Sequence, residues 1–123
     1  MSAPRVRRLV GVYDADGTVL GELAYFVRAR LGRAHCALCD ITHGRVRERD
    51  EWKARKATFD VPFDAYHRDD QPDAVRALGP PPLVAAELDD GTYEVLLDAG
   101  ALEACAGAPE RLVAALDAAR AGR

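Results

Sequence analysis

The residues best suited to chemistry in this chain are two cysteines, Cys36 and Cys39, in the motif Cys-Ala-Leu-Cys. Where a Cys-x-x-Cys motif begins a helix, the helix dipole and nearby cations lower the pKa of the first thiol, and the thiolate attacks a disulfide. The second cysteine then resolves the mixed disulfide. We therefore expect Cys36 to be the nucleophile and Cys39 the resolving cysteine. Arg33 and His35 are nearby cations that favour the thiolate, whereas Asp40 opposes it.

A metal site is the main alternative use of the same thiols. Cys36, Cys39 and His43 are close in sequence, and His67 or Cys105 would supply a further ligand. Zinc accepts such a mixture of sulfur and nitrogen, and Cu(I) or iron tolerates it. Typical zinc motifs have two paired halves, and this chain has one. Metal binding or metal sensing with Zn, Cu or Fe therefore stays open beside redox chemistry, and the sequence makes no cofactor certain.

A third alternative is a non-catalytic interaction domain in which the thiols only pack. Cys105 lies in an alanine-rich stretch, and we expect it to be a buried, inert side chain. His67 ends a predicted strand and is followed closely by Asp69, so we expect that carboxylate to orient the histidine ring.

An acidic motif suggests different chemistry near the amino terminus. The apolar run up to Tyr13 leads into Asp14-Ala15-Asp16-Gly17-Thr18, which resembles the first motif of haloacid dehalogenase-like phosphatases. That resemblance implies that Asp14 is a nucleophile and that Asp16 is a general acid and base, with Mg²⁺ bound between them and the phosphate. The remaining motifs of that family have no match here. We therefore expect the segment to form a turn that caps the next helix.

The elements that must position these residues follow from hydrophobic periodicity and turn residues. They are a strand over 5–13, a helix over 19–31, a charged, mostly exposed helical segment reaching 56 with Trp52 as its anchor, a strand over 59–67, and a short helix over 72–78. Strands over 83–88 and 92–97 are joined by Asp-Asp-Gly, which is the strongest hairpin signal in the chain. Two helices, over 101–106 and 109–119, complete the series.

The later elements resemble the thioredoxin fold, in which a cis-proline before the hairpin faces a Cys-x-x-Cys motif at the start of a long helix. The resemblance implies that Pro82 and the Cys36 pair take those places, and that Pro82, His67 and Asp69 line a substrate groove. The helix over 19–31 departs from the family order, and it would allow the thiols to lie at the opposite end of the sheet from Pro82. We expect a single α/β domain over 1–123, thioredoxin-like, with a mixed sheet of about four strands and flanking helices.

The whole chain also resembles an uncharacterised family of small bacterial proteins. The shared motifs are Tyr-x-Ala-Asp, Cys-x-Leu-Cys, Glu-Trp and His-x-Asp, which here are 13–16, 36–39, 51–52 and 67–69, together with a late cysteine like Cys105. The resemblance implies no particular activity.

Composition limits the other classes of function. The 123 residues are 49% hydrophobic, which is enough to bury one core without disulfides or a metal. The formal net charge is −3 and both signs are interspersed, so we expect no nucleic-acid partner. The segment 1–8 is charged and lacks an apolar core of the length that a signal peptide needs, and no apolar run approaches the roughly 18 residues that span a bilayer. We therefore expect a cytoplasmic protein without a membrane partner. The favoured prediction is a thiol-dependent redox protein whose partner is a protein thiol or disulfide. If the protein is an enzyme, we expect it to be a thiol–disulfide oxidoreductase. The sequence does not specify the oligomeric state.

Overall fold

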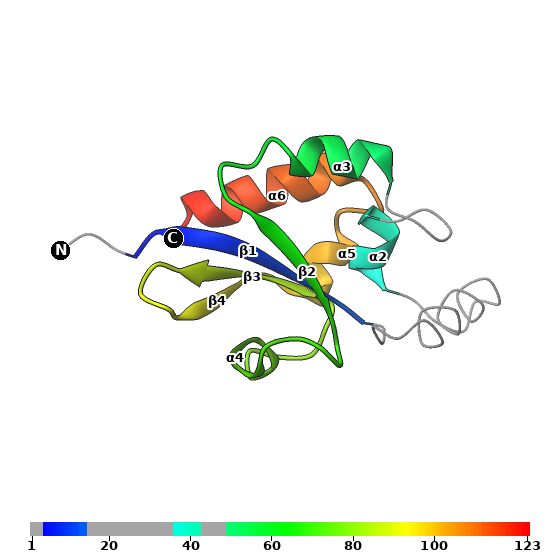
Figure 1. Cartoon of the computed structure of the whole chain (residues 1–123). Helices are drawn as coiled ribbons and strands as arrows, with labels where there is room; N and C mark the ends of the chain where they lie inside the picture. Colours follow the sequence, from blue (N-terminus) through cyan, green and yellow to red (C-terminus); the bar gives the residue numbers. More distant parts are fainter. Residues whose placement is uncertain (1–3, 15–35, 43–48) are drawn as a thin grey trace.

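A four-stranded mixed sheet forms the centre of the computed structural model, which describes residues 4–14, 36–42 and 49–123. The strands are β1 (Val6–Tyr13), β2 (Phe63–His67), β3 (Leu83–Leu88) and β4 (Tyr93–Leu97), in the spatial order β2-β1-β3-β4 (Figure 1). Strand β1 is parallel to β2 and antiparallel to β3, and β3 is antiparallel to β4. The expectation of an α/β chain with a four-stranded mixed sheet is confirmed.

The described residues contain five helices, and they are divided unequally between the two faces of the sheet. They are α2 (Ala37–Thr42), α3 (Asp50–Lys56), α4 (Asp73–Arg76), α5 (Ala99–Glu103) and α6 (Pro109–Ala121). Helices α2, α3, α5 and α6 lie on one face, and α4 lies on the other (Figure 1). Two local sequence signals define helix starts: Asp98 accepts a hydrogen bond from the Ala101 N–H at the start of α5, and Pro109 is the first residue of α6.

Strand β1 supplies both layers of the core because its neighbouring side chains point to opposite faces. Leu9 and Tyr13 belong to the apolar cluster beneath the four helices, whereas Val10 and Val12 pack with Val75 of α4. The strand is bordered by β2 and β3, and its residues from Leu9 onward are all buried. Its run of consecutive apolar residues is what a central strand covered on both faces requires.

The expected elements that fall within the described residues are largely confirmed, with shifted ends. The predicted strand over 59–67 is too long, because β2 begins only at Phe63 and the preceding residues form turns at the end of α3. The short helix after Pro72 is confirmed, and Pro72 flanks it as the N-cap residue. In the hairpin, Gly91 has a φ of 87°, a conformation that favours glycine and explains the Asp-Gly signal. The helix predicted over 19–31 lies outside the described residues.

Trp52 anchors α3, as predicted, by packing into an aromatic group with Phe59 and Phe63. Its side chain is fully buried, and its ring meets the Phe63 ring edge-to-face at 5.1 Å between centroids. Phe59 stacks on Phe63 at 6.2 Å. The Phe63 ring lies directly over Gly11 of β1, where an added Cβ would be 2.8 Å from Phe63 Cζ. Gly11 therefore provides the space that lets this aromatic group approach the sheet.

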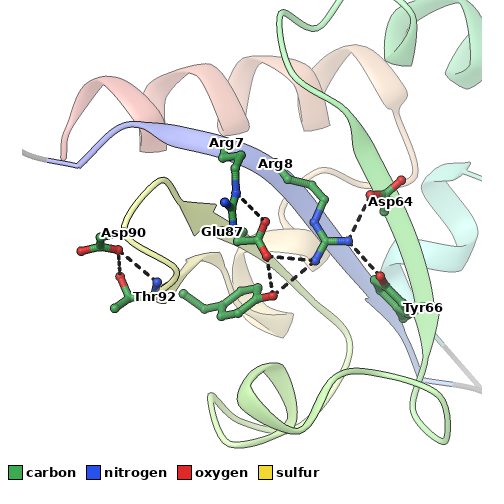
Figure 2. A network of polar contacts seen from close by, with 8 residues as sticks. Arg7, Arg8, Asp64, Tyr66, Glu87, Asp90 and Thr92 are labelled. Atoms are coloured by element: carbon green, nitrogen blue, oxygen red, sulfur yellow. Dashed lines mark hydrogen bonds and ion pairs between the residues drawn. The ribbon is translucent and has the colours of Figure 1, made fainter.

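A polar network crosses all four strands on the face that carries α4 (Figure 2). The Arg8 guanidinium donates hydrogen bonds to Tyr66 at 2.8 Å, Asp64 at 3.1 Å, Tyr93 at 3.3 Å and Glu87 at 3.4 Å. A β-bulge makes the network possible, because Val6 pairs with Leu88 and Arg8 pairs with Glu87, which leaves Arg7 as the extra residue. Arg7 then also donates to Glu87, at 3.0 Å, and the single carboxylate holds two arginines.

Within the described parts of the chain, none of the helices has both the length and the apolar composition needed to cross a bilayer.

Candidate thiol site

The two cysteines of the motif lie together at the start of α2. Cys36 directly precedes the helix, and its sulfur accepts a hydrogen bond from the backbone N–H of Cys39 at 3.3 Å. The sulfur therefore takes the role that a serine or aspartate side chain has at other helix starts. The two Sγ atoms are 2.7 Å apart and unbonded, with the Cys39 thiol donating to Cys36. A disulfide requires about 2.0 Å, so only a small movement is needed to join them.

The surroundings of Cys36 favour its thiolate. Its pKa is lowered first by the hydrogen bond from the Cys39 thiol, and further by the backbone N–H groups of Asp14 and Cys39. Burial and the negative charge of the Asp14 carboxylate act in the opposite direction. The Asp14 N–H lies 3.4 Å from Cys36 Sγ. A lowered pKa increases the fraction of Cys36 that is present as thiolate at neutral pH.

The thiols lie at the carboxyl end of β1, which is also the Pro82 end of the sheet. Asp14 follows the last residue of β1 and contacts Cys36, while the pairing of Val12 with Leu83 places the start of β3 at this same end. Pro82 immediately precedes β3, is buried, and has a cis peptide bond before it. The alternative in which the thiols lie at the opposite end of the sheet from Pro82 is therefore wrong.

Buried polar contacts hold α2 against β1. The Thr42 hydroxyl donates to the Leu38 carbonyl oxygen at 3.0 Å, and Tyr13 OH lies 3.0 Å from the same Thr42 oxygen. Because the Thr42 hydroxyl donates its proton to the Leu38 carbonyl oxygen, the Tyr13 hydroxyl is the donor in its hydrogen bond with Thr42. The end of the helix is held by Arg49, whose backbone N–H donates to the Thr42 carbonyl oxygen at 2.7 Å. The Arg49 guanidinium donates to the Ile41 carbonyl oxygen at 3.4 Å and links it to the Gly107 carbonyl oxygen, at 2.7 Å, in the segment before α6. These contacts fix the helix that carries both cysteines.

His67 is at the same sheet end, since it pairs with Tyr13 in the β1–β2 register and its ring lies 5.7 Å from the Tyr13 ring. A contact with Asp70, which the sequence did not single out, orients this residue. The His67 backbone N–H donates to Asp70 Oδ1 at 2.6 Å, and Nδ1 lies 3.6 Å from Asp70 Oδ2. The predicted Asp69 is exposed in the following turn. The Asp70 side chain reaches back across the turn to the backbone of His67, as aspartate side chains in turns commonly do. Asp70 therefore makes the contact that was predicted for Asp69.

A second feature missed from the sequence is the ion pair between Asp14 and Arg68. Arg68 Nη1 lies 3.7 Å from Asp14 Oδ1, and both side chains are partly exposed. The two residues follow directly after the parallel strands β1 and β2, respectively. The adjacency of those strands, once predicted, would have indicated the pair.

Comparisons with protein-family models, with curated proteins and with solved structures find no match for this chain. The chemistry of the site is therefore inferred from its own residues and their geometry.

Cys105 is buried near the end of α5, in the same apolar cluster as the thiol pair. Burial raises the pKa of its thiol, and the sulfur donates a weak hydrogen bond to the Ala101 carbonyl at 3.6 Å. These properties are those of an inert packing residue.

The metal alternative gains no support from the described residues. Over 4–14, 36–42 and 49–123, no three His, Cys, Asp or Glu side chains are grouped in a way that would hold a metal ion. The predicted ligand His43 lies outside the described residues, as do Arg33, His35 and Asp16.

Among the described residues, two surface hollows lie near the sheet, and neither is lined by a cysteine. One of about 570 Å³ is at the opposite end, beside Arg5 and Arg120. The other, of about 220 Å³, is lined by Pro80, Leu83 and the exposed Val95. Leu83 packs in the α4 layer, whereas the cysteines pack beneath the other helices. Neither hollow brings a solvent-filled space to the cysteines.

Proposed function

We propose that this protein is a thiol-dependent redox protein with a thioredoxin-like fold, in which Cys36 is the nucleophile and Cys39 the resolving cysteine. The observation that carries the proposal is the convergence on one sulfur: Cys36 Sγ accepts two backbone N–H groups and lies 2.7 Å from the Cys39 sulfur. The mixed β2-β1-β3-β4 sheet and the place of Pro82 at the thiol end support the thioredoxin-like assignment.

The proposed reaction is a two-electron exchange with a disulfide in a partner protein. The Cys36 thiolate attacks one sulfur of that disulfide, forms the mixed disulfide and releases the first partner thiolate. Cys39 then loses its proton and attacks Cys36 Sγ, which releases the second partner thiolate. The partner disulfide is reduced to two thiols, and the Cys36–Cys39 pair is oxidised to a disulfide. The reverse sequence would oxidise a partner dithiol.

Access to the sulfur is restricted, because Cys36 has 1% of its surface exposed and Cys39 has 9%. A partner disulfide can reach Cys36 only when the atoms that cover it move. We therefore expect Cys36 to react with alkylating reagents more slowly than an open thiol of the same pKa.

Mass spectrometry after mild oxidation tests the proposal. We expect a disulfide that joins Cys36 to Cys39 and leaves Cys105 as a free thiol, and we expect dithiothreitol to reverse it. The variants Cys36→Ser and Cys39→Ser should each lose this disulfide and the ability to reduce a small protein disulfide substrate, whereas Cys105→Ser should keep both. Failure of wild-type protein to form the disulfide, under oxidation that saturates a thioredoxin control, would refute the redox function.

Elemental analysis of the same preparation separates the metal alternative. A stoichiometric metal that is lost in Cys36→Ser, and whose removal by chelator lowers the melting temperature, would replace the redox proposal with a metal site. Metal content near zero with an unchanged melting temperature is the expected result.

A further inference from the structure

We propose that Arg68 is a positioning residue for the thiol site, which acts on Cys36 by holding and neutralising the Asp14 carboxylate. The inference rests on the proposed function, since it assigns to that site the residue that tunes its nucleophile. Nothing in the local sequence around the cysteines indicates Arg68, which comes from the turn after β2.

Asp14 has two opposite effects on Cys36. Its backbone N–H donates to the sulfur at 3.4 Å, which favours the thiolate, whereas its carboxylate is a nearby negative charge that disfavours the thiolate. Arg68 Nη1 lies 3.7 Å from that carboxylate. An opposite charge at this distance offsets part of the field that the carboxylate exerts on the sulfur. Arg68 therefore reduces the unfavourable effect of Asp14 and leaves the favourable one.

The backbone of Arg68 is held in place for this role. Its carbonyl oxygen accepts hydrogen bonds from Gln71 Nε2 at 3.1 Å and from Arg76 Nη2 at 3.3 Å. Gln71 is itself 6% exposed, so the turn is anchored in the protein interior. A fixed backbone reduces the conformational entropy that the arginine loses when it pairs with Asp14.

Few other charged groups in the described residues act on the Cys36 sulfur. Cys39 comes from its own helix and Asp14 from β1. At the end of β2, the His67 ring lies 5.7 Å from the Tyr13 ring, and its Nδ1 lies 3.6 Å from Asp70 Oδ2. The segment after α5 contributes the buried thiol of Cys105 to the same apolar cluster as Cys36. Substitutions in the Asp14–Arg68 pair therefore test how the charge of the Asp14 carboxylate affects the pKa of Cys36.

The pH dependence of Cys36 alkylation by iodoacetamide tests the inference, with each cysteine followed by peptide mass spectrometry in buffer that contains a chelator. In Arg68→Gln the apparent pKa of Cys36 should rise, so that alkylation below that pKa slows about two- to fivefold, as expected for a partly exposed ion pair. Arg68→Lys keeps the positive charge and should restore the wild-type profile. Asp14→Asn removes the unfavourable carboxylate and should lower the Cys36 pKa.

The double variant decides the mechanism. In the Asp14→Asn background, Arg68→Gln should have no further effect, because the carboxylate that Arg68 neutralises is absent. Arg7→Gln is the matched control: this exposed arginine pairs with Glu87 in the bulge of β1, away from the thiols, and its loss should leave the profile unchanged. Alkylation of Cys105 within the same samples reports any general loosening of the fold.

An unchanged Cys36 profile in Arg68→Gln, or a change that persists in the Asp14→Asn background, would overturn the inference. The redox function has its own readout, the Cys36–Cys39 disulfide, and the two failures can be told apart. A disulfide that forms normally while Arg68→Gln leaves the profile unchanged removes only the role of Arg68. A shifted profile without any disulfide removes only the redox function.

Discussion

Replacement of Gly11 by alanine should destabilise the protein and disturb the thiol helix together. An added Cβ at Gly11 would lie 2.8 Å from Cζ and 3.0 Å from Cε1 of Phe63, and 3.3 Å from Cδ2 of Leu38. Phe63 cannot easily turn away, because its ring is held edge-to-face by the buried Trp52 and stacked by Phe59. Leu38 lies between the two cysteines in α2.

The magnitude follows from two opposing contributions. Forcing one extra carbon into a packed core costs about 1–3 kcal/mol. Replacing a strand glycine reduces the conformational freedom of the unfolded chain and returns about 0.5–1 kcal/mol. We expect Gly11→Ala to lose about 1–2 kcal/mol of unfolding free energy, which is a fall of roughly 4–8 °C in melting temperature for a domain of this size.

Urea denaturation followed by fluorescence measures this directly, since Trp52 is the single tryptophan and lies against Phe63. Gly100→Ala is the control, because its Cβ would meet only Asp98 Oδ1, at an ordinary 3.5 Å, and alanine in α5 should stabilise by up to about 1 kcal/mol. Gly11→Ala should cost less in a Phe63→Leu background, where the ring is absent. The same cost in both backgrounds would refute the steric reasoning.

Two further predictions concern the network on the α4 face. Arg8→Met removes the donor of four hydrogen bonds and should cost about 1.5–3 kcal/mol of unfolding free energy in a urea titration. Arg7 is more exposed, so Arg7→Met should cost less than about 1 kcal/mol. Equal costs would contradict the central role of Arg8 in the network. The pKa of Glu87 is lowered by hydrogen bonds from Tyr93 and Arg7, so its contribution to stability is complete above the ordinary carboxyl pKa of 4.5 and is lost as the pH falls through the lowered value. Glu87→Gln should therefore flatten the fall in melting temperature on acidification below pH 4.5, and an unchanged acid slope would count against this assignment.

Features encoded by neighbouring residues were predicted well from the sequence. The hairpin signal depends on Gly91, and the anchor role of Trp52 depends on an aromatic residue in a charged segment, so both can be recognised within a few positions. That Trp52 packs in the core of this chain became clear only from the structure. The end of β2 was predicted correctly, but its start was not. Apolar residues such as Phe59 and Val61 pack against the core from turns, and an apolar pattern alone does not distinguish such residues from a strand.

Contacts between distant segments could not be predicted in the same way. Arg8 and Glu87 are far apart in sequence, and neither has a local pattern that indicates burial of its charge. The partner of His67 was misassigned to Asp69 because sequence proximity does not specify which carboxylate in a turn reaches back to the backbone. The position of the thiols at the Pro82 end required the register of three strands, which depends on the pairing of β1 with both neighbours.

The bulge at Arg7 helps to specify the register in which β1 pairs with β3. A slip of β1 by one residue exchanges the faces of all its side chains, so the Arg8 guanidinium would enter the apolar layer beneath α6 and the Glu87 carboxylate would lose a partner. The misaligned sheet would bury an unpaired charge on one face and place Leu9 among the polar side chains of the network on the other. The pairing of Arg7 and Arg8 with Glu87 therefore disfavours the wrong strand register. The correct pairing of β1 with β3 also places Asp14 at the end of the sheet where it contacts Cys36.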